Sequence, residues 1–510
     1  MIKPLRPLLL CVYVFVALGI LMFFLPDEVP LLGEYELRFF NYQNTLLKEK
    51  PTYADISGIK DKFDRSKKQP TSKQTTDPQD TTQADTQTFD PSKYETDTVS
   101  YKVRIQYSPD HPQALAPFFT YLKSVNQGAS DALIRVIHYG DSQLEGDRMT
   151  AYLRNRFQER FGGCGGGLQP LTNKLNMKIS VTQQNDATWQ YHPIFGKGYS
   201  RANPNTYGLL ANYYRFGKAL TATPKAEDST NLVADFTTWY EAKATYRRSN
   251  AAHQKDQRVE NIKVLYHNPQ APLRISILEG ADTVAQESFS PTSQAGVYQT
   301  TLTNAFQQVT VHFKSPANPQ IYGVALDCNQ GITFDNVPIR GSSGLDFTKM
   351  NAAHLQQQMQ ALKVKMMIVQ YGVNVDQNLS DYTFYERGFY NQLKFLKSLA
   401  PDMCILVIGT SDRSYNKNGD YVSYPNIEKL RDAQRNAAFK AGCAFWDLYE
   451  VMGGKNSMPS WVFNKPPLAE KDFTHFSYRG ANIVSEALYE ALIYEYEKYL
   501  SGYTSTPENM

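Results

Sequence analysis

The sequence has little cysteine and no surplus of either charge. Its 510 residues include five cysteines, too few and too widely spaced for a fold held together by disulfides. No Cys-x-x-Cys pair and no His-Glu-x-x-His motif occurs, so zinc sites of those two kinds are not expected. Lys plus Arg number 53 against 50 Asp plus Glu, which is not the basic surplus typical of nucleic-acid binding. The sequence predicts no metal, no cofactor and no nucleic-acid partner.

Wholesale disorder is also excluded, because hydrophobic residues make up 42% of the chain and aromatic residues 13%. That content provides enough apolar surface to offset the entropy cost of folding. A chain of 510 residues exceeds what one ordinary hydrophobic core organises. We therefore expect two or three domains.

An uncharged apolar run occupies residues 8–25, with the sequence LLLCVYVFVALGILMFFL. As a helix it would be roughly 27 Å long, close to the hydrocarbon thickness of a bilayer. Lys3 and Arg6 precede the run and acidic residues follow it, an order that favours a cytoplasmic N-terminus. The pattern predicts a signal anchor over residues 1–26. A cleaved signal peptide and a buried helix of a soluble domain are the alternatives.

The segment after the apolar run differs in composition from the rest of the chain. Residues 64–88 contain no aromatic side chain and only Ala84 among the aliphatic ones. Such a segment cannot bury enough apolar area to become ordered. We therefore expect residues 27–98 to be a juxtamembrane segment with a disordered tether, and residues 503–510 to be a C-terminal tail.

Strand and helix patterns alternate in two parts of the chain, residues 99–177 and 334–502. The expected strands are residues 133–139, 364–371, 404–409 and 444–448, and the expected helices are residues 145–161, 382–399, 426–441 and 478–500. Near-continuous apolar strands that alternate with helices predict a parallel sheet covered on both faces. Cys404 and Cys443 begin neighbouring strands, where they could form a disulfide or remain as buried thiols.

The intervening residues 178–333 follow a different pattern. Short runs of alternating apolar and polar residues are separated by Pro, Asn and Gly. This period of two predicts an antiparallel β sandwich of the jelly-roll kind, inserted into an α/β domain. The glycine-rich residues 162–167 lack the Lys-Ser/Thr of a phosphate-binding loop, so we expect a flexible loop near a site rim.

A candidate nucleophile lies where the first strand gives way to a helix. Ser142 follows Gly140 and Asp141 there, at the sheet edge where open α/β folds place their sites. The simpler interpretation is a helix cap formed by Asp141 or Ser142. A serine also needs a base, and His475 has Asp472 three residues before it to accept its Nδ1 proton. A capped turn with a surface histidine is the alternative for that pair.

Four short motifs occur in the order typical of the SGNH (GDSL-type) hydrolase superfamily, which the chain resembles. They are Gly140-Asp141-Ser142-Gln143, Gly341-Ser342-Ser343-Gly344, Tyr371-Gly372-Val373-Asn374 and Asp472-Phe473-Thr474-His475. The resemblance implies a flavodoxin-like three-layer α/β fold with Ser142 as nucleophile, His475 as base and Asp472 as its partner. It also implies an oxyanion hole formed by the N–H groups of Ser142 and Gly344 and the Asn374 amide.

Two positions depart from the superfamily pattern. Gln143 stands where leucine is commoner, and Val375 replaces an acidic residue that often follows the asparagine. Neither change removes a catalytic group. The inserted module resembles the carbohydrate-binding-like β module of bacterial peptidoglycan O-acetylesterases.

These resemblances imply a serine esterase that removes O-acetyl groups from a cell-wall or extracellular glycan. The expected location is the inner membrane, through one anchor, with the catalytic domain in the periplasm. One alternative is a polysaccharide O-acetyltransferase with a membrane-bound O-acyltransferase as partner, and another is a non-catalytic glycan-binding protein. All four motifs lie outside residues 178–333, so deleting that insertion should spare the hydrolysis of small esters more than the hydrolysis of polymer.

Overall fold

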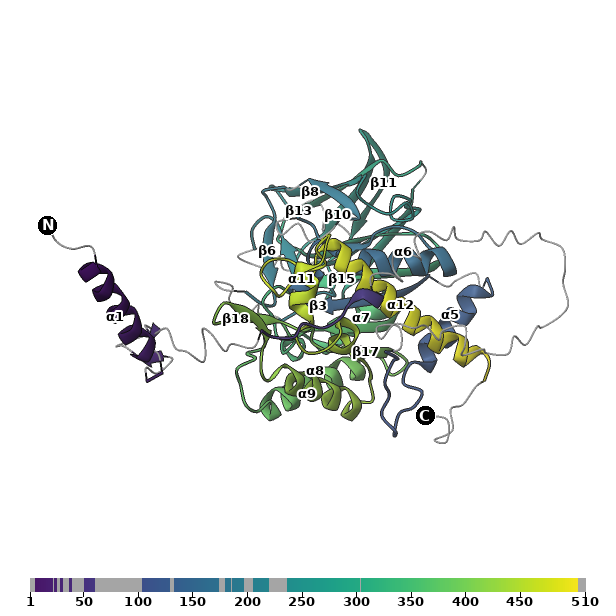
Figure 1. The fold of residues 1–510 in the computed structure, drawn as a ribbon. Helices are drawn as coiled ribbons and strands as arrows, with labels where there is room; N and C mark the ends of the chain where they lie inside the picture. The colour runs from purple at the N-terminus through teal and green to yellow at the C-terminus, as the bar shows by residue number, and fades with distance from the viewer. Residues whose placement is uncertain are drawn as a thin grey trace.

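The structure is a computed structural model. It describes residues 5–21, 23–24, 28–30, 36–38, 50–59, 103–128, 133–173, 179–184, 186–196, 205–219, 236–302 and 304–502. The predicted tether at residues 64–88 and the tail at 503–510 lie outside these ranges. Figure 1 shows an α/β body next to a body of β strands only.

A five-stranded sheet forms the centre of the α/β body. Its strands, in spatial order, are β15 (Gly331–Pro338), β3 (Leu133–Gly140), β16 (Val364–Gln370), β17 (Cys404–Ile408) and β20 (Ala444–Trp446). All neighbouring pairs are parallel. Numbered along the chain, the strand order is 2-1-3-4-5, that of flavodoxin-like folds. Every residue of β3, β15 and β17 is buried, and for β17 this burial explains the continuous apolar sequence.

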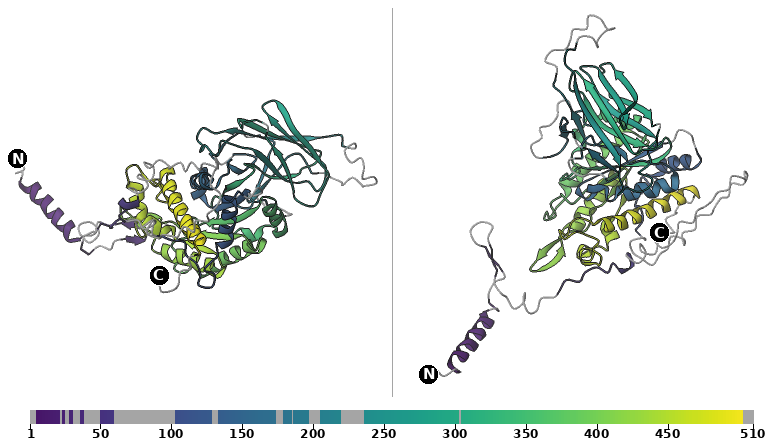
Figure 2. Two further views of the ribbon diagram at one scale, coloured as in Figure 1. Left: turned by 90° about the vertical axis from the view of Figure 1, so that its right-hand side faces the viewer. Right: turned by 90° about the horizontal axis from the view of Figure 1, so that it is seen from above.

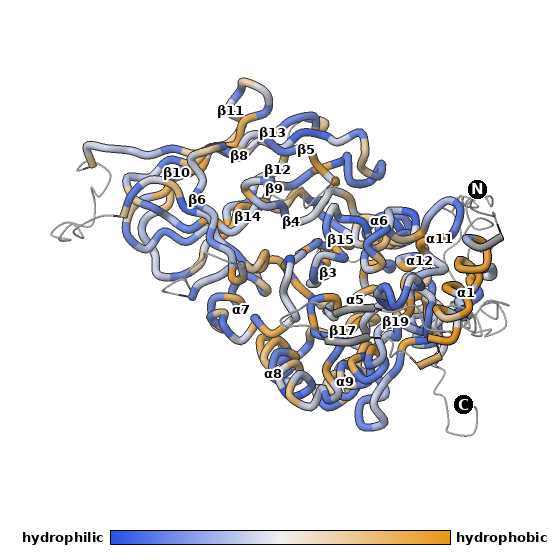
Figure 3. The backbone as a smooth tube through the Cα atoms, turned by 60° about the vertical axis from the view of Figure 1, so that its left-hand side comes forward, coloured by the Kyte–Doolittle hydropathy of each residue, from blue (hydrophilic) through white to orange (hydrophobic). Residues whose placement is uncertain are grey.

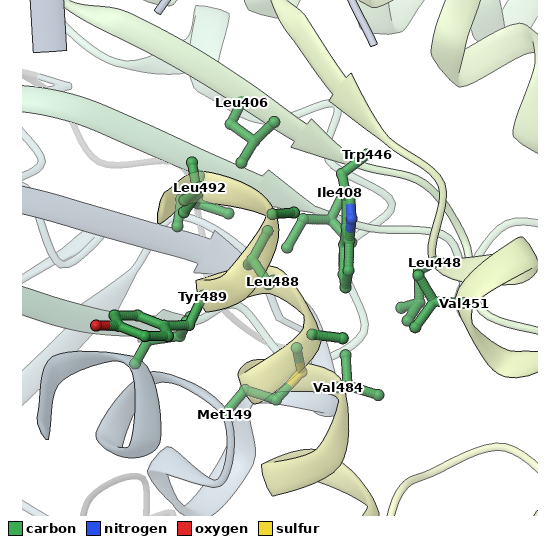
Figure 4. Close-up of a cluster of buried hydrophobic side chains, with 14 of the residues drawn as sticks. Met149, Leu406, Ile408, Trp446, Leu448, Val451, Val484, Leu488, Tyr489 and Leu492 are labelled. Atoms are coloured by element: carbon green, nitrogen blue, oxygen red, sulfur yellow. The ribbon is translucent and has the colours of Figure 1, made fainter. Parts of the chain in front are cut away.

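Helices cover both faces of this sheet (Figures 1 and 2), so the predicted three-layer α/β fold is confirmed. One face carries α5 (Ala116–Asn126), α6 (Thr150–Phe161) and α12 (Tyr478–Leu500), and the other carries α7 (Ala352–Ala361), α8 (Thr383–Leu399) and α9 (Ile427–Lys440). Figure 4 shows the core of the first face, where Leu488 of α12 lies among Leu406, Ile408 and Trp446 of the sheet.

Shorter elements complete the α/β body and the N-terminal part. They are η2 (Ser142–Asp147), η3 (Phe347–Lys349), α10 (Leu448–Met452), α11 (Ser457–Phe463), the hairpin β18 (Ser414–Lys417) with β19 (Asp420–Ser423), and the pair β1 (Glu28–Pro30) with β2 (Glu36–Arg38). The helix predicted over residues 145–161 starts only at Thr150, because Gly146 has a left-handed φ of 69° that interrupts it.

The inserted body consists of two antiparallel sheets, as predicted. One contains β5 (Val181–Gln184), β8 (Tyr240–Arg248), β13 (Gln308–Ser315), β10 (Leu273–Glu279) and β11 (Asp282–Phe289). The other contains β4 (Gly167–Gln169), β6 (Gln190–Pro193), β7 (Asn212–Arg215), β9 (Asn261–His267), β12 (Gly296–Thr301) and β14 (Gln320–Asp327). A shared core of apolar side chains joins the two sheets.

The limits of this sandwich differ from the expected 178–333. Its first strand, β4, pairs with β14 and already begins at Gly167. At the other end, β15 begins at Gly331 and belongs to the parallel sheet. The three residues of β4 are too few to show a period of two, and Thr333, Asp335 and Asn336 give the buried β15 a polar sequence.

The sandwich is not a detached module, because it shares a hydrophobic core with the α/β body. Leu168, Leu265 and Tyr322 of the sandwich belong to the same buried cluster as Tyr139 and Val337 of the parallel sheet. The Tyr139 hydroxyl also donates a 2.7 Å hydrogen bond to the carbonyl of Leu209. The two bodies therefore form one packed unit.

Two cysteines that the sequence did not single out as a pair form a disulfide. Cys164 and Cys328 are bonded to each other, whereas Cys404 and Cys443 are free and buried. The expectation of a flexible loop over residues 162–167 near the site is wrong. The Ile332 N–H donates to the Gly162 carbonyl, which places this segment at the amino end of β15, opposite the edge where Ser142 lies.

Near the N-terminus, helix α1 (Leu5–Leu21) is hydrophobic along most of its length (Figure 3). Its large apolar side chains are exposed, with Phe15 at 74%. We find no helix within the described ranges that has the length and apolarity to cross a membrane. The signal anchor over residues 1–26 stays a prediction.

Residues 50–59 pack on the α/β body, within the range expected to be a tether. Ile56 and Ile59 are buried in the core of its first face. The Ser460 hydroxyl of α11 donates a 2.6 Å hydrogen bond to the Ala54 carbonyl, and the Ala54 N–H donates to the Asn456 carbonyl. This part of the N-terminal segment therefore belongs to the folded protein.

Candidate active site

Ser142 lies directly beyond the carboxyl end of β3, the second strand in the spatial order of the sheet. The preceding Gly140 lies so close to β16 that a Cβ atom there would be 2.7 Å from the Gln370 carbonyl oxygen. Only glycine fits at that position. The Asp141 carboxylate accepts hydrogen bonds from the N–H groups of Gln143 (3.0 Å) and Val373 (3.3 Å), which ties this turn to the loop after β16.

The structure brings Ser142, His475 and Asp472 into one chain of hydrogen bonds. Ser142 Oγ lies 2.7 Å from His475 Nε2, and His475 Nδ1 lies 2.6 Å from Asp472 Oδ2. This is the arrangement in which Nε2 can take the serine proton while the carboxylate stabilises the imidazolium. Both simpler interpretations hold in part, because Asp141 caps the short helix η2 (Ser142–Asp147) and Asp472 caps its own turn. Neither describes the contact between Ser142 and His475.

A tight turn holds Asp472 and His475 together. Asp472 Oδ1 accepts from the N–H groups of Thr474 and His475, both at 3.0 Å. Phe473 takes a left-handed φ of 54°, which is unfavourable for a bulky residue, but its ring stacks on that of Tyr421 at 3.5 Å. Burial opposes the charge of Asp472, yet the hydrogen bonds from His475 and Thr474 outweigh it and lower the pKa of this carboxyl.

His138, the histidine closest in sequence to Ser142, has a different environment. It is fully buried in β3, and its Nε2 and Nδ1 atoms lie 3.0 Å from Gln370 Oε1 and Thr150 Oγ1. Burial lowers the pKa of His138 to about 3, so the ring is neutral. It therefore serves as a hydrogen-bonding core residue.

Of the two residues expected to complete an oxyanion site beside Ser142, Asn374 lines the pocket and Gly344 does not. Asn374 lines the pocket around Ser142 and donates one Nδ2–H to the Ser342 carbonyl at 3.1 Å, which leaves the second donor of its amide available. The Gly344 N–H instead donates to the buried Ser342 hydroxyl at 3.0 Å, and Gly344 does not line the pocket. Gly341 does, and its N–H has no partner within the described ranges.

The pocket around the triad has a volume of about 500 Å³ and a charged rim. It is lined by Ser142, Glu145, Arg148, Arg340, Gly341, Asn374, Glu470, Asp472, His475, Phe476 and Tyr478. Arg340 Nε lies 3.2 Å from Glu145 Oε1, and Arg148 donates to the carbonyls of Glu145 and Phe476, each at 2.8 Å. Sequence reasoning missed these rim residues, because no motif includes them.

We expect Asn374→Ala to lower kcat on an acetyl ester by about 10²–10³-fold with little change in KM, the effect typical of losing one oxyanion donor. Asn374 is exposed and donates one hydrogen bond, so the unfolding midpoint should change little. Steady-state kinetics and thermal unfolding of the same preparations measure both quantities. An unchanged kcat would remove Asn374 from the oxyanion site.

We expect Asp141→Asn to change how stability depends on pH. Burial raises the pKa of Asp141 from 3.8 to about 6, against the opposing hydrogen bonds from Gln143 and Val373. The folded state therefore binds more protons than the unfolded state in this window, so Asp141 makes the free energy of unfolding fall as the pH rises from 3.8 to about 6.

Urea unfolding of wild type and Asp141→Asn between pH 4 and 7 tests this. The difference between the two free energies of unfolding should fall through about pH 6 and then stay constant. The buried Asp412, whose pKa is also raised to about 6, is present in both proteins and cancels in the difference. A difference that is flat or rises across the window would contradict the assignment to Asp141.

No protein-family model matches the sequence, and no curated protein matches it. A solved structure of a peptidoglycan O-acetylesterase is similar at 20% sequence identity, with 76% of this chain and 98% of that chain covered and a TM-score of 0.58. The resemblance to SGNH hydrolases inferred from the motifs is therefore matched at the level of the fold.

Two further solved structures match less well. One is a family two carbohydrate esterase from Cellvibrio japonicus, at 8% identity, covering 63% of this chain and 99% of that chain, with a TM-score of 0.21. The other is a salicylyl-acyltransferase from a tetracycline biosynthetic pathway, at 10% identity, covering 61% and 96%, with a TM-score of 0.24. At these scores neither carries an argument.

Proposed function

We propose that this protein is a serine esterase that removes O-acetyl groups from a cell-envelope polysaccharide, peptidoglycan or a glycan like it. The observation that carries the proposal is the hydrogen-bonded series Ser142–His475–Asp472 at the carboxyl edge of the sheet, beside Asn374 and Gly341. A serine, a base held by a carboxylate, and N–H donors around one pocket are the parts that acyl transfer requires.

In the proposed reaction, Ser142 Oγ attacks the acetyl carbonyl while His475 Nε2 takes the hydroxyl proton. The tetrahedral oxyanion accepts hydrogen bonds from the Asn374 amide and the N–H groups of Gly341 and Ser142. His475 then protonates the departing sugar oxygen, which leaves an acetyl ester on Ser142. Water then attacks that ester while His475 takes its proton, and His475 returns the proton to Ser142 Oγ as the ester bond breaks and acetate is released.

The substrate class is supported by the fold and by the pocket. The structure with a TM-score of 0.58 is a peptidoglycan O-acetylesterase, and the match covers 76% of this chain. The pocket is open to solvent at its charged rim, where Arg340 is 66% exposed, so a side group of a long polymer could reach Ser142.

The test is an assay of the full-length protein in detergent on an acetylated chromogenic ester and on O-acetylated peptidoglycan, with and without a soluble oligosaccharide acceptor. The full chain is needed because residues 50–59 pack into the core. Release of acetate from peptidoglycan supports the esterase. Acetylated oligosaccharide without free acetate would favour a polysaccharide O-acetyltransferase, and no turnover of any ester would favour a glycan-binding protein.

We also propose that α1 attaches the protein to the inner membrane, with the catalytic domain in the periplasm. The support is the uncharged run over residues 8–25 and the exposure of its apolar side chains. Since residues 50–59 pack on the α/β body, the segment between anchor and enzyme is shorter than the sequence composition suggests. Cell fractionation and sequencing of the mature N-terminus test the attachment, and a soluble form that begins near residue 26 would contradict it.

A further inference from the structure

Gln143 connects the nucleophile turn to the loop that carries His475. Its Nε2 donates a 2.7 Å hydrogen bond to the Thr474 carbonyl, and its Oε1 accepts a 3.2 Å hydrogen bond from the Phe476 N–H. The side-chain amide therefore binds the backbone on both sides of His475. Gln143 is 2% exposed, so water does not compete for these two bonds.

The connection matters because the reacting pair is assembled from distant parts of the chain. Ser142 and His475 are separated by 333 positions in sequence, and their side chains meet through the 2.7 Å contact described above. The Asp472–His475 turn is held by its own internal bonds, but those bonds do not fix its distance from Ser142. Gln143 is adjacent to Ser142 in the chain, so its amide sets that distance directly.

Two other hydrogen bonds join these parts of the chain, but neither binds the backbone on both sides of His475. Arg148 donates to the Phe476 carbonyl at 2.8 Å, on one side of His475 only. The Tyr478 hydroxyl donates to the Gly146 carbonyl at 3.3 Å, also on one side of His475 only. A leucine, commoner at this position in the superfamily that the motifs resemble, could fill the volume but could neither donate nor accept.

We infer that Gln143 is a positioning residue that holds His475 Nε2 within hydrogen-bonding distance of Ser142 Oγ. The inference rests on the proposed function, since it assigns Gln143 to the same triad. The inference adds that one side-chain amide sets the position of the His475 loop relative to Ser142. This amide donates on one side of His475 and accepts on the other. Losing it would let the loop move, and a displacement of about 1 Å can cost on the order of 10²-fold in rate.

The test uses Gln143→Met, which has nearly the same length but lacks both functions, and Gln143→Leu as a second variant in case the first does not fold. We expect each to lower kcat on an acetyl ester by about 10–100-fold with KM unchanged. The rate at which a fluorophosphonate probe labels Ser142 should fall by a similar factor. The ¹⁵N resonance of His475 Nε2 should shift toward its position in Ser142→Ala, because the contact with Ser142 Oγ is lost.

Gln392→Met is the matched control. Gln392 is also buried, accepts from the Thr348 N–H at 2.9 Å and donates to the Thr348 hydroxyl at 3.1 Å, but it lies on α8 away from the pocket. It should lower the unfolding midpoint as Gln143→Met does while leaving kcat, the labelling rate and the His475 resonance unchanged. This comparison separates positioning from general loss of stability.

The outcomes distinguish the inference from the proposed function. A folded Gln143→Met or Gln143→Leu with wild-type labelling and an unshifted His475 resonance would overturn the role of Gln143 and leave the triad intact. Failure of the probe to label Ser142 in the wild-type protein would count against the proposed esterase. In that case the His475 resonance still reports whether Gln143 positions the loop.

Discussion

Ser142→Ala should leave a folded protein whose turnover of an acetylated chromogenic ester is lower on the order of 10⁶-fold. The variant removes one hydroxyl from a residue that is 8% exposed and contacts His475, so the free energy of unfolding should change little. Such a large loss is expected because the remaining members of a triad cannot form an acyl-enzyme without the nucleophile. Single-turnover assays with circular dichroism of the same samples measure both effects.

Two comparisons make this result specific. Asp472→Asn keeps the geometry of the turn but holds the wrong tautomer of His475, and a loss of about 10⁴-fold is typical of that change. Ser411→Ala serves as a control, because Ser411 is a buried serine at the same sheet edge that does not line the pocket. If Ser142→Ala kept more than about a hundredth of wild-type turnover, Ser142 would not be the nucleophile.

The sequence was sufficient to predict the hydrogen-bonded series Ser142–His475–Asp472, because each half of the series is local. Ser142 is fixed by the end of a buried strand and by Gly140, where only glycine fits against β16. Asp472 and His475 are three positions apart and meet within a single turn. Strand ends and short turns follow from local sequence patterns, so short motifs were enough to predict where these three residues lie.

The oxyanion site could not be predicted as well, since it depends on the path of a loop. The motif favours Gly344 over Gly341, and both glycines have a left-handed φ of 82°. What distinguishes them is the buried hydroxyl of Ser342, which accepts the Gly344 N–H and so directs it away from the pocket. A bond of this kind is decided by tertiary packing, which leaves no signal in the spacing of glycines.

The relation between the sandwich and the α/β body was also hidden in the sequence. Because all four motifs lie outside residues 178–333, deletion of that range was expected to spare small-ester hydrolysis. The structure opposes this expectation through two buried arginines. Arg135 of β3 pairs with Asp327 and Asp335, and Arg154 of α6 pairs with Asp256 and with Asp147, at the end of the nucleophile turn.

These pairs cross the boundary between the two bodies. Arg135 with Asp327, and Arg154 with Asp256, each join a residue of the α/β body to one of the sandwich, and all four side chains are 0% exposed. Removing one partner of a buried pair leaves an uncompensated charge, which typically costs 3–5 kcal/mol. Deletion of residues 178–333 would remove both aspartates together and also expose the core shared by the bodies. We therefore expect no folded protein from that deletion.

Arg154→Met tests this coupling with a single change. It keeps much of the side-chain volume but leaves the carboxylates of Asp147 and Asp256 buried without their cation, so the free energy of unfolding should fall by about 3–5 kcal/mol. The change also removes the 2.9 Å hydrogen bond that the Arg154 guanidinium donates to the Phe334 carbonyl of β15. Urea unfolding followed by circular dichroism measures the loss.

Arg160→Met, on the same helix, is the control. Its guanidinium is 34% exposed and pairs with Glu497 near the surface, so the change should stay within about 1 kcal/mol. Because Asp147 ends the turn that begins at Ser142, Arg154→Met should also lower kcat in the fraction that remains folded. Two results would mean that the sandwich is an independent module. One is a fall in the free energy of unfolding for Arg154→Met as small as that for Arg160→Met. The other is a protein without residues 178–333 that still folds cooperatively and turns over substrate. The stability and the site would then not depend on the two arginines that join the bodies.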